Sequence, residues 1–165
     1  MPNNQFLNSV KSGFQIKEYR LDSLMPLFRE KLAEGKTVRF YPKGTSMMPM
    51  LRQGIDSVVL SPLPGKLKKY DLPLYQRDNG QYVLHRIVKV TGDTYTCIGD
   101  NQQVYEYHVR HDQMIGVVTG FYRDQEYHSV TELSHRTYRC LWHHSRKLRP
   151  KVRAGLSKIK RIFKK

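Results

Sequence analysis

Three polar residues near the middle of the chain could together perform acyl transfer. Ser46 lies in the segment Gly44–Leu51, whose proline keeps it out of regular helix. A serine attacks a carbonyl carbon when a histidine accepts its proton and a carboxylate holds the other ring nitrogen. His85 and Asp100 are the candidates for these two roles. The segment is not the nucleophile elbow of α/β hydrolases, because that motif needs a glycine where Met48 stands.

A predicted β-hairpin brings the histidine and the carboxylate together. Gly92-Asp93 separates two strand-like runs, 81–91 and 94–99, and glycine in the first turn position is typical of a two-residue type II′ turn. Counting outward from this turn, His85 faces Asp100. Opposed residues lie on the same face of the sheet with Cβ atoms about 4.5–5.5 Å apart. A shift of one residue would put the two side chains on opposite faces.

The pattern of the remaining chain predicts a mostly β fold. Residues 1–20 are polar and irregular, and Asp22 can cap a short helix that Gly35 ends. Beyond it, short runs rich in Val, Ile, Tyr and Thr alternate with Gly, Pro, Asn and Asp. These runs predict strands near 37–41, 55–60, 72–76, 81–91, 94–99 and 114–122. We therefore expect an N-terminal segment (1–36), a β core (37–122) and a C-terminal extension (123–165).

Positive charge is concentrated at the C-terminal end of the sequence. The chain has 29 Lys and Arg against 14 Asp and Glu, and ten of these cations but no carboxylate lie in residues 143–165. Apolar residues at intervals of three or four predict an amphipathic helix that begins near Pro150. A basic amphipathic helix is typical of binding to an anionic membrane surface, which is the partner we expect for this segment. The alternatives are a solvated or body-packed terminal helix and, less favoured, contact with nucleic acid.

Composition excludes several other classes of protein. A chain of 165 residues can bury a core without disulfides, and Cys97 and Cys140 form no C-x-x-C pair. His108, His111 and the pair His143-His144 lack the spacing and the acidic or cysteine neighbours of a metal site, so we expect no metal and no cofactor. No apolar run approaches the roughly 20 residues of a membrane span. The first residues do not resemble a secretory signal, so we expect a cytoplasmic protein, peripheral at the inner face of the membrane if the basic extension binds lipid.

Several short motifs occur in a recognisable order. They are Ser46-Met-Met-Pro-Met-Leu51, Gly54-Ile-Asp56, Val83-Leu-His-Arg-Ile-Val88, Gly99-Asp-Asn101 and Ile115-Gly-Val-Val118. In their order and spacing they resemble the boxes of the signal peptidase and SOS-repressor superfamily of serine peptidases (S24/S26). The resemblance covers roughly residues 37–122 and implies a mostly β, signal-peptidase-like fold.

The resemblance also implies roles for individual residues. Ser46 would be the nucleophile and His85 the general base, and His before Arg is similar to the endoplasmic reticulum and archaeal type, whereas bacterial signal peptidases and self-cleaving repressors usually have Lys there. Because neighbours on a strand face opposite sides, Arg86 is expected to be structural. The family usually gives the orienting role to an acidic residue a few positions after Gly-Asp-Asn, where Glu106 stands. The hairpin register favours Asp100, and Glu106 is the alternative.

Two functions follow as expectations. The first is a serine endopeptidase that cleaves a peptide or protein substrate by a Ser–His mechanism. The second is a non-catalytic peptide-binding or regulatory module of the same fold, which reaches a membrane or nucleic acid through its basic extension. Met47, Met48 and Met50 could line a substrate groove or fill gaps in the core.

Overall fold

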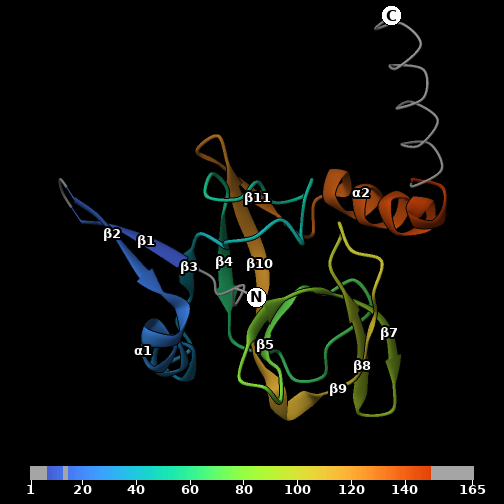
Figure 1. Cartoon of the computed structure of the whole chain (residues 1–165), viewed down its shortest axis with the longest axis horizontal. Helices are drawn as coiled ribbons and strands as arrows, with labels where there is room; N and C mark the ends of the chain where they lie inside the picture. Colours follow the sequence, from blue (N-terminus) through green and yellow to red (C-terminus); the bar gives the residue numbers. More distant parts are fainter. Residues whose placement is uncertain (1–6, 13–14, 150–165) are drawn as a thin grey trace, which may run out of the picture. The chain divides into compact units, whose positions relative to one another are not determined.

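The computed structural model describes residues 7–12 and 15–149, which form mostly β structure with two α-helices (Figure 1). The expectation of a mostly β fold is confirmed. The chain divides into two compact units, Met1–Glu132 and Leu133–Lys165. The first unit contains, in chain order, β1 (Leu7–Ser12), β2 (Gln15–Arg20), α1 (Leu21–Ala33), β3 (Val38–Phe40), β4 (Ser57–Ser61), β5 (Pro73–Gln76), β6 (Tyr82–Leu84), β7 (Arg86–Thr91), β8 (Thr94–Ile98), β9 (Glu106–Arg110), β10 (Met114–Arg123) and β11 (Glu126–Ser129).

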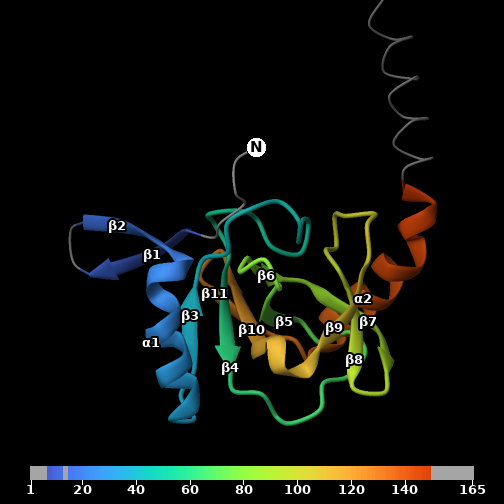
Figure 2. The ribbon, with the colours of Figure 1, turned by 60° about the horizontal axis from the view of Figure 1, so that its bottom comes forward.

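The N-terminal segment begins with a hairpin that the sequence did not reveal. β1 and β2 pair antiparallel. Irregular structure was expected here, because the residues are mostly polar and show no apolar alternation. The helix expected from Asp22 is present as α1, which lies alongside β3 (Figure 2). It buries one apolar stripe, and its Phe28 packs on Phe40 of β3 with ring centroids 5.5 Å apart.

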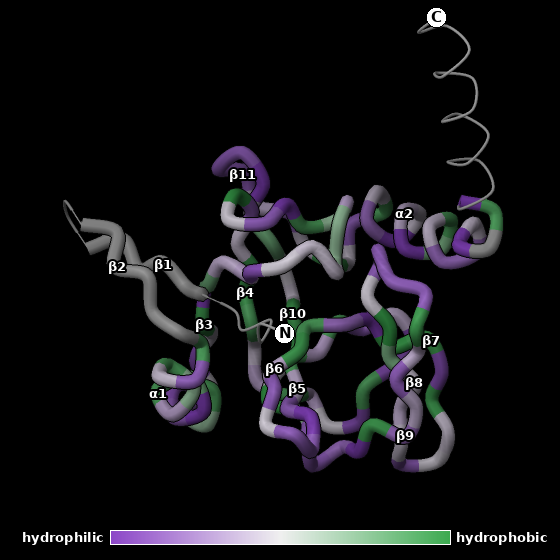
Figure 3. The backbone as a smooth tube through the Cα atoms, viewed as in Figure 1, coloured by the Kyte–Doolittle hydropathy of each residue, from purple (hydrophilic) through white to green (hydrophobic). Residues whose placement is uncertain are grey.

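Most strands belong to one antiparallel sheet with the order β3-β4-β10-β5-β6, and β11 also pairs with β10. The ten-residue β10 is the centre of this sheet, and its first eight residues are almost all buried. Hydrophobic stretches of β4 and β10 therefore lie side by side (Figure 3). Strands buried on both faces read as continuous apolar runs, as Val58 to Leu60 do here.

A second antiparallel sheet has the order β7-β8-β9. The single strand predicted over 81–91 is in fact two, because β6 belongs to the first sheet and β7 to the second. His85 is the residue at this break. Side chains from both sheets share one core, which includes Tyr75 of β5, Val83 of β6, Ile87 of β7 and Cys97 of β8. The histidine is thus placed where the two sheets meet.

The second unit contains α2 (Leu133–His144), followed by a single 3-10 turn, η2 (Ser145–Lys147). The sequence did not predict α2. The helix predicted to begin near Pro150 lies outside the described residues. Neither α1 nor α2 is long and apolar enough to cross a bilayer, and these are the α-helices in the part of the chain that the structure describes.

Candidate active site

Ser46 begins a tight turn between β3 and β4. The amide of Met48 donates to the carbonyl of Thr45 (3.2 Å), and the amide of Leu51 donates to the carbonyl of Met47 (3.1 Å). Met47 and Met50 are buried, whereas Met48 is exposed and Ser46 half-buried. Two of the three methionines therefore fill the core, and only Met48 is placed to touch a substrate.

Hydrogen bonds fasten this turn to the loop after β8. The amide of Asn101 donates to the carbonyl of Ser46 (2.8 Å), and the Asn101 side-chain amide donates to the carbonyl of Thr45 (3.3 Å). The two loops lie side by side in both views of the ribbon (Figures 1 and 2). Segments more than fifty residues apart in the sequence are thereby held together.

Gly99 lies beside both the backbone of Ser46 and the ring of His85. A Cβ atom on Gly99 would lie 2.7 Å from the carbonyl oxygen of Ser46 and 3.1 Å from Nε2 of His85. Both atoms therefore border the same small space, which only glycine leaves open. Nε2 is the ring nitrogen of His85 that does not face the acid described below.

Glu106, the first residue of β9, holds the other nitrogen of the imidazole. Nδ1 of His85 lies 2.8 Å from Oε1 of Glu106, and His85 is only 2% exposed. An ionised carboxylate can only accept hydrogen bonds, so Nδ1 carries a hydrogen, and in the neutral imidazole Nε2 is then the acceptor. The hydroxyl of the buried Tyr75 lies 3.4 Å from the same Nδ1. Hydrogen on Nδ1 and none on Nε2 is the tautomer that a general base for serine requires.

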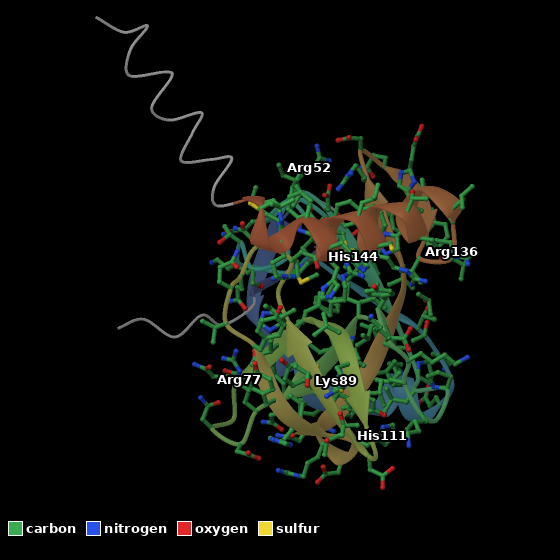
Figure 4. All side chains as sticks on the ribbon, turned by 90° about the vertical axis from the view of Figure 1, so that its right-hand side faces the viewer. Arg52, Arg77, Lys89, His111, Arg136 and His144 are labelled. Carbon is green, nitrogen blue, oxygen red and sulfur yellow. The ribbon has the colours of Figure 1, made fainter. Side chains whose placement is uncertain are left out.

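Arg77 keeps the Glu106 carboxylate ionised. Its Nε donates to Oε2 (2.8 Å) and its Nη2 to Oε1 (2.6 Å), so the pair is bidentate. Burial acts to raise the pKa of Glu106, but the hydrogen bonds from Arg77 and His85 outweigh it and lower the pKa to about 2. Burial also raises the pKa of Tyr75, and the neighbouring Glu106 charge adds to this effect. Arg77 lies in the turn between β5 and β6 (Figure 4).

The predicted opposition of His85 and Asp100 is wrong, and a β-bulge is the reason. The expected register holds from the turn as far as Lys89, which pairs with Thr96. Val88 is then an extra residue in β7, so Ile87 pairs with Cys97. The shift by one residue removes His85 from the position opposite Asp100. Arg86 instead pairs with Ile98, two residues before Asp100, so that Arg86 and Asp100 come to lie on the same face.

The carboxylate of Asp100 forms a buried ion pair with Arg86. Nε and Nη2 of Arg86 donate to its two oxygens at 2.9 and 2.8 Å. The same guanidinium lies 2.8 Å from the sulfur of Met50 and donates to the carbonyl of Tyr70 (3.2 Å). Arg86 therefore joins the turn that begins at Ser46, the loop before β5 and the loop after β8, in agreement with the structural role expected for it.

A second bulge, in β9, brings Glu106 to the histidine. Tyr95 pairs with Val109, but Cys97 pairs with Glu106, so β9 contains one residue more than β8 over this stretch. His108 takes up the extra length with a positive φ of 56°. Without it Glu106 would point to the opposite face of the sheet. Glu106 instead lies in one cross-strand row with Cys97 and Ile87. Ile87 is two residues after His85 in the chain.

Sequence reasoning missed Arg77 and Tyr75. The signal that could have found them is the Asn79-Gly80 pair, which is typical of a hairpin turn and separates the strands that became β5 and β6. In the observed register Tyr75 pairs with Val83, two residues before His85. That register would have pointed to Tyr75 as a neighbour of the imidazole.

Comparison with known proteins adds no assignment. No protein-family model matches this chain, and no curated protein matches it either. Among residues 7–12 and 15–149, no three His, Cys, Asp or Glu side chains are grouped so that they could hold a metal ion. These comparisons therefore assign no chemistry to the site.

Proposed function

We propose that this chain is a serine endopeptidase of the signal-peptidase type, with Ser46 as nucleophile, His85 as general base and Glu106 as the orienting acid. The observation that supports it best is the hydrogen-bonded order of the site. Glu106 is hydrogen-bonded to Nδ1 of His85, and both Nε2 of His85 and the carbonyl oxygen of Ser46 border the space beside Gly99. The resemblance of the motifs to that superfamily supplies the reaction type.

In the proposed reaction, the Ser46 hydroxyl attacks the carbonyl carbon of a peptide bond while Nε2 of His85 takes its proton. The imidazolium that forms is stabilised by Glu106, which keeps its charge because its pKa is about 2. His85 then returns the proton to the leaving amine, and water releases the acyl group by the same steps. The amide of Ser46, beside the space left by Gly44, is the candidate donor to the oxyanion.

The substrate expected for this site is an extended peptide segment. A β-rich peptidase commonly holds such a segment along a strand edge through main-chain hydrogen bonds. The exposed Met48, two residues after Ser46, would offer an apolar contact beside the scissile bond. Small side chains at the cleavage site are expected from the resemblance.

The test compares wild type with Ser46→Ala and His85→Ala on a peptide library, with cleavage products identified by mass spectrometry. Ser23→Ala is a matched control, because Ser23 is an exposed serine on α1. We expect the two site variants to lose activity by about 10⁵-fold or more and the control to keep it.

Two results would reject this proposal. Equal cleavage by all four proteins would mean that the activity does not come from Ser46 and His85. Wild type that binds peptides without cleaving them would point to the non-catalytic module instead.

A further inference from the structure

The second compact unit of the chain carries most of its excess charge. Residues 133–165 contain twelve of the 29 Lys and Arg and none of the 14 Asp and Glu. The preceding 132 residues share the other seventeen cations with all fourteen acids, so they are close to neutral. A unit of this composition attracts a polyanionic surface.

Large apolar side chains are exposed on this unit despite its charge, next to polar ones such as Thr137 of α2. Leu133 is 73% exposed, Leu141 70% and Leu148, just after η2, 61%. Leu133 and Leu141 are eight residues apart on α2, which puts them on the same half of the helix, and Leu148 follows the 3-10 turn η2. Three leucines that are each more than 60% exposed within residues 133–149 favour a surface that is covered when the protein is bound.

An arginine and a histidine are also exposed on α2. Arg136, in the first turns of α2, is exposed, and His144 is exposed near the end of the helix (Figure 4). The aromatic residues occupy another side: Tyr138 stacks on Trp142 with centroids 5.7 Å apart, and the guanidinium of Arg149 lies 3.7 Å from the Trp142 ring centre. Since Trp142 already has these two neighbours, it is a poor platform for stacking nucleic-acid bases.

We propose that the part of this unit from Leu133 to Arg149 docks on an anionic membrane surface through α2. Leu133, Leu141 and Leu148 enter the boundary between headgroups and acyl chains, and Arg136 binds an anionic headgroup. Nucleic acid would use the cations but gives no role to exposed leucines, whereas a helix lying in a membrane interface uses both. This proposal does not depend on the peptidase function, because it concerns binding alone.

The test is sedimentation of the full chain with vesicles of phosphatidylcholine containing phosphatidylglycerol, and with vesicles of phosphatidylcholine alone. Leu141→Gln and Leu148→Gln should each lower partitioning onto the anionic vesicles by about tenfold, since each removes an apolar side chain from the lipid boundary. Arg136→Gln should lower it by about fivefold. Leu27→Gln on α1, where Leu27 is 48% exposed, is the matched control and should bind as wild type does.

Three results would overturn the proposal. Leucine variants that bind anionic vesicles as well as wild type would show that charge alone is responsible. Equal binding to both kinds of vesicle would show that anionic headgroups are not recognised. Tight binding to a duplex in fluorescence anisotropy, with no binding to vesicles, would identify nucleic acid as the partner. Unchanged circular dichroism of the variants confirms that these losses do not come from unfolding.

Discussion

Replacing Glu106 and Asp100 in turn should separate catalysis from folding. Both acids follow β8 in the sequence, but one holds the imidazole and the other a buried guanidinium. In Glu106→Gln, either orientation of the new amide turns its NH₂ group toward a donor, because Arg77 donates to both carboxylate oxygens. The imidazole then loses the anion that fixes its tautomer. We expect kcat to fall by about 10⁴-fold, the loss seen when the acid of a Ser–His–Asp triad becomes an amide.

Asp100→Asn should act mainly on stability. It leaves the buried Arg86 without a counter-charge, which typically costs about 3–5 kcal/mol. For a chain of this size, a loss of about 3 kcal/mol lowers Tm by about 10 °C. The fraction that remains folded should keep most of its activity per folded molecule, because Asp100 does not orient the imidazole.

The assay measures peptide cleavage and thermal unfolding on the same preparations of both variants. Calorimetry gives the Tm, and active-site titration with a serine-reactive fluorophosphonate gives the fraction of competent enzyme. The reasoning fails if Asp100→Asn loses as much kcat as Glu106→Gln at an unchanged Tm. It also fails if Glu106→Gln keeps full activity.

Two further predictions concern the same site. The lowered pKa of Glu106 means that its pairs with Arg77 and His85 stabilise the fold fully above its ordinary pKa of 4.5 and stop doing so as pH falls toward about 2. Urea unfolding of wild type should show the free energy of unfolding losing this contribution, at most about 3 kcal/mol, as the pH falls between these values, whereas Glu106→Gln should show no such loss. Parallel plots of unfolding free energy against pH for the two proteins would contradict the prediction. Gly99→Ala places a methyl group 2.7 Å from the carbonyl oxygen of Ser46. The turn must therefore move. We expect the rate of cleavage to fall at least tenfold and the free energy of unfolding to fall by about 1–3 kcal/mol. An alanine variant with wild-type kcat would refute the close approach.

Much of the fold could be predicted because it depends on local pattern. Runs of β-branched and aromatic residues predicted the strands that became β3, β4, β5, β8 and β10, and the helix starting near Asp22 was found. The turn at Gly92 has the positive φ that a type II′ turn needs in its first position. β9 and α2 were missed, because β9 is short and has only two apolar residues, Tyr107 and Val109, and α2 buries no continuous apolar stripe.

The sequence by itself determined which side chains are available for chemistry and in what kind of segment each lies. Ser46 is in a turn because of its immediate neighbours, and His85 follows a run of strand-forming residues. The tertiary structure decided which acid meets the histidine. One extra residue in β7 and another in β9 reverse the faces of Asp100 and Glu106. The strands that carry these bulges also pack on the other sheet, because Ile87 and Cys97 share a core with Tyr75 and Val83. No count along a single hairpin could have predicted that outcome.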